Sequence, residues 1–180
     1  MNYQHTIIPR PSEKMTDDQR AEAVRSWLLQ DTANHFVVNN APFAWDTRAG
    51  QCLYRAKHGD KVIACAIGPY LADGSEGLAD PSTSVCDIYG TLIEGKDQNS
   101  WAFSLVGEEF LGDLQNAHDT SAELDRILRL ADIAADMHWL KDWIADLVLS
   151  DASENGNAEF MKACLNKLAE IHNCEAPDYS

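Results

Sequence analysis

Basic residues are scarce in this sequence. It contains 14 lysines and arginines against 29 aspartates and glutamates, which gives a formal net charge of −15 at pH 7. A field of this sign repels nucleic-acid phosphates and anionic membrane surfaces, and it attracts basic protein surfaces. We therefore expect no direct binding to nucleic acid or membrane, and a basic protein is the favoured partner. An acid excess is equally typical of proteins that need it only for solubility.

Long apolar runs are also missing. No stretch approaches the roughly 20 residues that a membrane-spanning helix requires. The opening residues, MNYQHTIIPRPSEKM, lack the basic segment and apolar run of a signal peptide, so secretion is not expected. Without an export signal, the five irregularly spaced cysteines are expected to be reduced thiols in a cytoplasmic protein.

Three well-defined functional motifs do not occur. There is no Gly-x4-Gly-Lys-Ser/Thr phosphate-binding loop, no Gly-x-Gly-x-x-Gly turn and no His-Glu-x-x-His helix. What the sequence does contain is apolar material for one domain, since its 180 residues are 45% hydrophobic. We expect an irregular arm over residues 1–15 and a single globular domain over residues 16–180.

The apolar pattern predicts mostly helices. Thr16 precedes two acids and apolar residues at helical spacing, which is typical of a capped helix start. Residues 34–45 are expected to be loop with a short extended piece. Residues 72–100 are expected to be a long loop that encloses one short helix or strand.

The chain from residue 101 onward is also expected to be helical. Ser121 is predicted to cap a helix whose apolar face extends to about residue 149, and a last helix is expected over roughly residues 158–172. These segments and one β-hairpin, or a small sheet, predict a mainly helical α+β fold.

The hairpin is predicted from two runs of strand-forming residues, 51–55 and 61–67, on either side of a turn that contains Gly59. This arrangement would bring Cys52 and Cys65 close together on neighbouring strands, with buried side chains.

Tyr54 and Arg55 are adjacent on the first of these strands and should face opposite sides. We expect Tyr54 on the core side and Arg55 paired with an acid such as Asp73. The hairpin is then interpreted first as a structural nucleus.

A zinc site is the alternative. Cys52, Cys65, His118 and His138 are the residue types that bind tetrahedral zinc. The two thiols are separated by 12 residues, however, instead of the two to four of a zinc knuckle. Buried free cysteines and hydrogen-bonded core histidines explain the same residues. The favoured interpretation therefore needs no cofactor.

A thiol nucleophile would need Cys65, His118 and Asp119 to act together. Adjacent residues of a helix point about 100° apart, so we do not expect Asp119 to orient His118 directly.

Acidic residues are concentrated toward the C-terminus. The last 80 residues contain 16 acids and five bases. Several aspartates recur at helical spacing and should form one acidic face, which is either simply solvated or binds a partner. These residues are Asp125, Asp132, Asp136, Asp142 and Asp146.

Two blocks of the sequence resemble a family of small proteins found in phages, prophages and some bacteria. The first block runs from Cys52 to Gly77 and has the pattern Cys-x-Tyr-Arg, a glycine turn and Cys-Ala-x-Gly. The second is Leu111-Gly-Asp-Leu-Gln-Asn-Ala-His-Asp119. After it, the pattern Ile133-Ala134-x-x-x-His138-x-Leu140 resembles the helix that closes the family's sequence. The family has no assigned activity, so the resemblance implies a genomic setting in a bacterial host.

The leading functional hypothesis combines the resemblance with the charge. It is a non-enzymatic phage-type accessory protein that binds a host protein through the acidic face and inhibits a nucleic-acid-guided defence system, in the manner of an anti-CRISPR protein. The alternative is a small metal- or thiol-dependent enzyme that uses Cys52, Cys65, His118 and Asp119.

Overall fold

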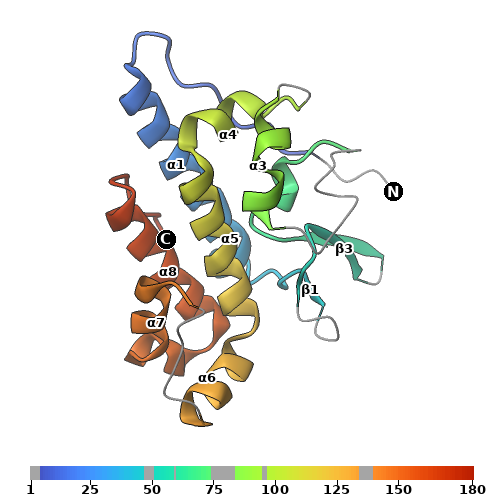
Figure 1. Cartoon of the computed structure of the whole chain (residues 1–180), viewed down its shortest axis with the longest axis vertical. Helices are drawn as coiled ribbons and strands as arrows, with labels where there is room; N and C mark the ends of the chain where they lie inside the picture. Colours follow the sequence, from blue (N-terminus) through green and yellow to red (C-terminus); the bar gives the residue numbers. More distant parts are fainter. Residues whose placement is uncertain (1–4, 47–50, 59, 74–83, 95–96, 134–139) are drawn as a thin grey trace.

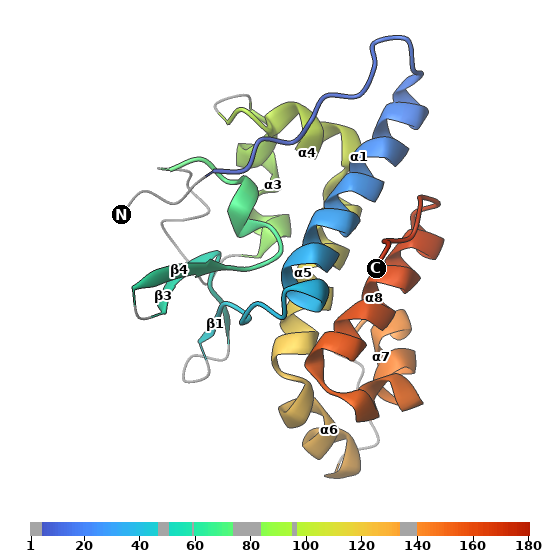
Figure 2. The same ribbon diagram turned by 180° about the vertical axis from the view of Figure 1, so that it is seen from behind.

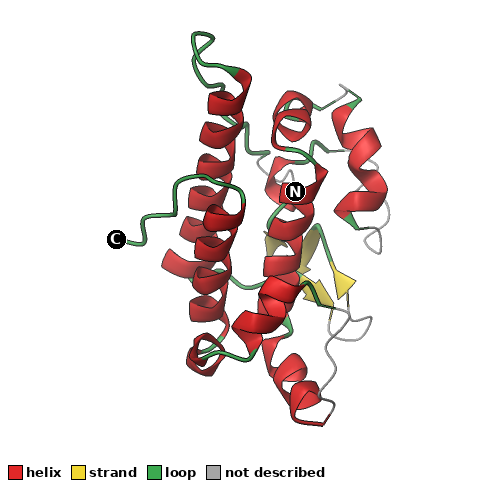
Figure 3. Ribbon diagram, turned by 60° about the vertical axis from the view of Figure 1, so that its left-hand side comes forward, coloured by secondary structure: helices red, strands yellow, loops and turns green. Residues whose placement is uncertain are grey.

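The structure, a computed structural model, describes residues 5–46, 51–58, 60–73, 84–94, 97–133 and 140–180. Seven α-helices lie within these residues, and they make up most of the regular structure. Figure 3 shows the strands close together, partly behind the central helix. The prediction of a mainly helical α+β single domain is confirmed. No helix of the described ranges is long and apolar enough to cross a membrane.

Helix α1 (Asp17–Ala33) begins as the sequence predicts. The Thr16 hydroxyl accepts a hydrogen bond from Gln19 N at 3.3 Å, and Gln19 Oε1 accepts one from Thr16 N at 3.0 Å. This reciprocal cap satisfies two amides that the helix leaves open. The helix does not stop before residue 34, because a π-helical turn, η1 (Asn34–Val38), continues it. The predicted loop therefore starts one turn later, and the extra turn buries Phe36.

Two pairs of short antiparallel strands follow. They are β1 (Trp45–Asp46) with β2 (Gln51–Cys52), and β3 (Arg55–His58) with β4 (Lys61–Ala64). The predicted hairpin is present, but its first strand begins at Arg55 instead of residue 51. The reason is that Leu53 N donates to Ala44 O at 2.9 Å, so the chain before Tyr54 is paired with the segment around β1.

The next helices are α3 (Val85–Ile93), α4 (Ser100–Val106) and α5 (Glu108–Ala122), with a short 3-10 turn, η2 (Gly68–Tyr70), before them. Helix α3 is the short element expected between residues 72 and 100. Gly107 joins α4 to α5 with a φ of 88°, a backbone conformation that residues with a Cβ rarely adopt. The chain can therefore turn sharply between the two helices.

Helix α5 lies at the centre of the molecule, between α1 and α3 and against α8 (Asn157–Ile171) (Figures 1 and 2). The face of α8 that the sequence predicted to be buried has no solvent exposure at four positions: Met161, Cys164, Leu165 and Leu168. One continuous apolar core joins these helices to the arm and to the chain on either side of the hairpin.

The remaining elements are α6 (Leu124–Ile133), α7 (Asp142–Val148) and a 3-10 helix, η3 (Asp151–Asn155). The prediction of one helix from Ser121 to about residue 149 is wrong. Ser121 is fully buried inside α5, and its hydroxyl donates to Ala117 O at 2.7 Å instead of capping a new helix. Figure 1 shows α6 at the end of the molecule opposite the first turn of α1.

Candidate functional site

The block around the hairpin is a packed structural unit. Tyr54 is 2% exposed, and its carbonyl accepts a hydrogen bond from Cys65 N at 3.2 Å. A Cβ added to Gly68 would lie 1.7 Å from that same carbonyl oxygen, so only glycine fits there. The expectation that Tyr54 lies on the core side is confirmed. Packing therefore accounts for the presence of Tyr54 and Gly68 in the first sequence block.

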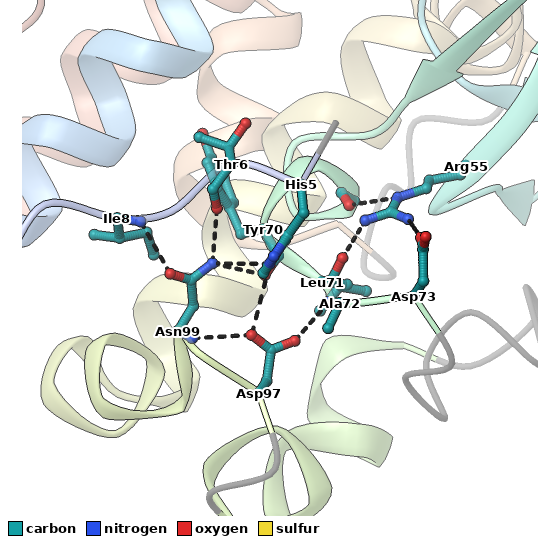
Figure 4. Close-up of polar contacts among 11 residues, drawn as sticks. His5, Thr6, Ile8, Arg55, Tyr70, Leu71, Ala72, Asp73, Asp97 and Asn99 are labelled. Atoms are coloured by element: carbon teal, nitrogen blue, oxygen red, sulfur yellow. Dashed lines mark hydrogen bonds and ion pairs between the residues drawn. The ribbon is translucent and has the colours of Figure 1, made fainter. Parts of the chain in front are cut away.

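Arg55 holds the segment that follows the hairpin. Its Nε donates to Gly68 O at 3.0 Å, its Nη1 to Asp73 Oδ1 at 2.6 Å and its Nη2 to Leu71 O (Figure 4). The predicted pairing of Arg55 with Asp73 is therefore confirmed. A guanidinium that bonds backbone carbonyls and a carboxylate at once orders an irregular segment.

Asn99 fastens the N-terminal arm to the same region. Its side chain has no solvent exposure; Oδ1 accepts from Ile8 N at 2.9 Å, and Nδ2 donates to Thr6 O and Tyr70 O, both at 2.8 Å (Figure 4). Asp97 extends the cluster, because its carboxylate accepts from Asn99 N at 2.9 Å and from the backbone of residue 72. Sequence reasoning missed this cluster. The sequence does contain one indication of it. Asp97 and Asn99, residue types that are common at helix N-caps, stand directly before an apolar helix.

The two cysteines do not face each other across one hairpin, which corrects the prediction. Cys52 lies in β2 opposite Trp45, whereas Cys65 follows β4 and bonds to the backbone of Tyr54. The Cys65 side chain has no solvent exposure, as expected, and its Sγ accepts from Gly68 N at 3.4 Å. For Cys52 the described structure extends only to the backbone.

His118 and Asp119 do meet, contrary to the prediction. His118 Nδ1 lies 2.8 Å from Asp119 Oδ1, because side-chain torsions bring together two groups whose Cα–Cβ bonds diverge. A carboxylate can only accept, so Nδ1 donates. The imidazole is fully buried against Phe36 and Phe43, with ring centroids 5.1 and 5.2 Å away. Its Nε2 has no hydrogen-bond partner among the described residues.

The described residues contain no group of three His, Cys, Asp or Glu side chains that could hold a metal ion. The Cys52 side chain and His138, which belongs to residues 134–139, lie outside the described structure. The zinc hypothesis therefore stays a prediction. The buried aromatic surroundings of His118 are typical of a core histidine.

A second polar centre, also missed from the sequence, connects the C-terminal helices. Asp113 of α5 is 2% exposed and binds Lys141 Nζ, at the start of α7, and His172 Nε2 at 2.9 Å, at the end of α8. Burial alone would raise the pKa of Asp113, but hydrogen bonds from His172 and Lys141 hold that pKa below its ordinary value. Arg25 of α1 donates to His172 O at 3.2 Å and joins a fourth helix to this centre.

The acidic residues form an exposed surface around α7. Residues 140–159 contain five acids and one base. All five acids are exposed, and we call them the α7–η3 surface: Asp142, Asp146, Asp151, Glu154 and Glu159. The one base, Lys141, forms an ion pair with the buried Asp113, which offsets its charge, although its side chain is 43% exposed. Leu149, 72% exposed, lies within this segment.

The predicted acidic face is divided between two helices. Asp125 is exposed on α6, whereas Asp142 and Asp146 are exposed one turn apart on α7. The backbone of Asp132 belongs to α6, and Asp136 lies outside the described residues. The aspartates therefore do not follow a single helix.

Comparison with known proteins adds no relative. No family model, curated protein or solved structure matches the chain. The resemblance to the phage family therefore remains a prediction that rests on the two sequence blocks. In the structure, the described residues of both blocks mainly build the core and its hydrogen bonds.

Proposed function

We propose that this protein is a non-enzymatic binding protein whose α7–η3 surface engages a basic surface of another protein. The observation that carries the proposal is the charge arrangement of residues 140–159. Five exposed carboxylates share this segment with one lysine, and that lysine is bound to a buried aspartate. Lys162 Nζ lies 3.9 Å from Glu159 Oε2 and offsets that carboxylate, so the other four carry the excess negative charge.

The like charges on α7 lower the stability of that helix. Asp142 and Asp146 are four residues apart on a helix of seven residues, and like charges at this spacing destabilise a helix by a few tenths of a kcal/mol. A basic partner would remove this repulsion. Leu149, exposed between α7 and η3, would give the same partner an apolar contact.

The resemblance to phage proteins supplies the proposed setting. In the cytoplasm of a bacterial host, protein surfaces that hold the phosphate backbone of a guide or target nucleic acid are basic. An acidic protein can compete for such a surface without touching nucleic acid. We propose a nucleic-acid-guided defence complex as the class of target.

The test compares two pairs of exposed acids with the same spacing. The double variant Asp142→Asn/Asp146→Asn changes α7, and Asp18→Asn/Glu22→Gln changes α1 by the same net charge. Each tagged protein is incubated with host lysate, the captured protein is identified, and its affinity is then measured with purified components. We expect the α7 variant to bind about tenfold more weakly and the α1 variant to match the unmodified protein.

Salt dependence provides the second measurement. Binding through the α7–η3 surface should weaken between about 0.15 M and about 0.5 M salt, and the α7 variant should show a smaller change. The triple variant of the predicted face, Asp125→Asn/Asp132→Asn/Asp136→Asn, extends the test to α6. Equal weakening by the α1 and α7 variants would mean that only net charge matters. Unchanged binding in both acidic-face variants would refute the proposal.

A further inference from the structure

A cavity of about 190 Å³ lies where the C-terminal end of α1 and η1 meet the turn after β4 and the N-terminal arm. Its lining includes Thr6, Asp31, Thr32, His35, Cys65 and Tyr70. One water accounts for about 30 Å³ of liquid, so the cavity can hold a small organic group. It is smaller than the roughly 300–1,000 Å³ of a typical drug-sized site.

Asp31 is a half-buried carboxylate in the wall of this cavity. Its Oδ2 accepts a hydrogen bond from the Tyr70 hydroxyl at 2.7 Å, which fixes its orientation because Tyr70 is itself 1% exposed. No lysine, arginine or histidine of the described ranges forms an ion pair with Asp31. A partly desolvated carboxylate without a counter-charge favours a cationic ligand.

The nearby imidazole does not supply that charge. Burial lowers the pKa of His35, the charge of Asp31 raises it and His118 lowers it, with the net result below the ordinary 6.5. His35 is therefore neutral at pH 7 and offers one acceptor nitrogen.

The Thr32 hydroxyl belongs to the same wall, but its Oγ1 is closed even to a molecule the size of water, so a ligand in the cavity cannot reach it. The lining thus offers a carboxylate and a neutral imidazole. A ligand that matches these groups must be rich in donors. Guanidinium carries five N–H donors in one plane and no acceptor.

We infer that this cavity binds a guanidinium group through the Asp31 carboxylate, with His35 accepting from a further donor. The group belongs either to a free small molecule or to an arginine side chain of a bound protein. The site is formed by different elements from those of the α7–η3 surface, so it does not depend on the proposed function.

The experiment is a titration of the full chain followed by NMR, with the His35 ring protons and the backbone amides of residues 31–36 and 65–70 as reporters. The probes are methylguanidine, its neutral analogue methylurea, and an acetylated, amidated pentapeptide with one central arginine. We expect saturable shifts with methylguanidine in the millimolar range and none with methylurea. Saturation by the peptide as well would show that the site accepts the arginine side chain of a partner protein, whereas saturation by methylguanidine alone would restrict it to free small molecules.

Asp31→Asn tests the carboxylate directly. The asparagine oxygen can still accept from the Tyr70 hydroxyl, so the fold should be retained, and Asp18→Asn on the same helix is the matched control. We expect Asp31→Asn to raise the Kd for methylguanidine at least about tenfold and Asp18→Asn to leave it unchanged. Thr32→Val, which replaces the inaccessible hydroxyl with a methyl group, should also leave it unchanged. The inference is overturned if no guanidinium probe saturates, if methylurea binds equally, or if folded Asp31→Asn binds as well as the unmodified chain.

Discussion

The two buried polar centres of this molecule, Asn99 and Asp113, differ in what they bind. Asn99 has no solvent exposure and bonds mainly to backbone groups of the N-terminal arm and the turn after β4. Asp113 is 2% exposed and bonds to two side chains, Lys141 and His172. One centre is a neutral amide and the other is an ionised carboxylate.

The difference follows from the elements that each centre connects. The arm and the turn have no helical ladder, so their buried amides and carbonyls need outside partners, and an amide side chain can both donate and accept. Helices α5, α7 and α8 satisfy most of their own backbone groups. Only side chains are left to connect them, and a carboxylate between two basic side chains does so strongly. Irregular and helical regions are thus held by different chemistry.

The substitution expected to destabilise the protein most is Gly68→Ala, in the irregular region. Gly68→Ala would place a Cβ 1.7 Å from Tyr54 O, and a backbone atom cannot move aside cheaply. We expect a loss of about 4 kcal/mol in the free energy of unfolding, or no folded protein, as measured by urea denaturation or by soluble yield.

Gly90→Ala is the matched control for this substitution. Gly90 is exposed inside α3, and an added Cβ meets nothing within 4 Å. We expect this variant to gain up to about 1 kcal/mol, because alanine is the better helix former. A loss below about 1 kcal/mol in Gly68→Ala would show that the turn after β4 adjusts easily and is not the rigid unit described above.

The second largest loss of stability is expected for a substitution in the helical region, Asp113→Ala. Asp113→Ala leaves the imidazole of His172 and the ammonium of Lys141 without their shared partner. Removing one member of a buried ion pair costs about 3 kcal/mol, and urea denaturation measures the loss. Asp125→Ala, an exposed aspartate on α6, should change stability by less than about 0.5 kcal/mol. Similar small losses in both variants would mean that Asp113 does not hold the helices together.

The sequence predicts those parts of the fold that depend on neighbouring residues. The Thr16 cap, the pairing of β3 with β4 and the buried face of α8 each rest on residues close together in the sequence. The two polar centres could not be predicted in this way, because Asn99 binds Ile8 across 91 positions and Asp113 binds His172 across 59. Nothing local indicates which distant group will be the partner.

Burial also decides the role of a residue type. Ser121 was predicted to cap a helix, which exposed serines commonly do, but inside the core its hydroxyl bonds to the carbonyl one turn back. Cys52 was predicted to pair across the hairpin, but the strand that carries it pairs with β1 instead. Of the aspartates predicted from their spacing, the structure shows Asp125, Asp142 and Asp146 to be exposed. Their division between α6 and α7 could not be predicted, since it depends on where the helix ends.

The smallest predicted effect distinguishes the two centres by their response to pH. The folded-state pKa of Asp113 lies below the ordinary 3.8, because hydrogen bonds from His172 and Lys141 outweigh the effect of burial. Its contribution to stability is therefore complete above the unfolded-state pKa and is lost as the pH falls through the lower folded-state pKa. The amide of Asn99 does not titrate.

The experiment measures the free energy of unfolding from about pH 6 to about pH 3. As the pH falls, this free energy should decrease more steeply in the unmodified protein than in Asp113→Ala. Asn99→Ala should be less stable throughout by about 2 kcal/mol and should run parallel to the unmodified protein. Parallel curves for the unmodified protein and Asp113→Ala would contradict our assignment of an ionised carboxylate at Asp113.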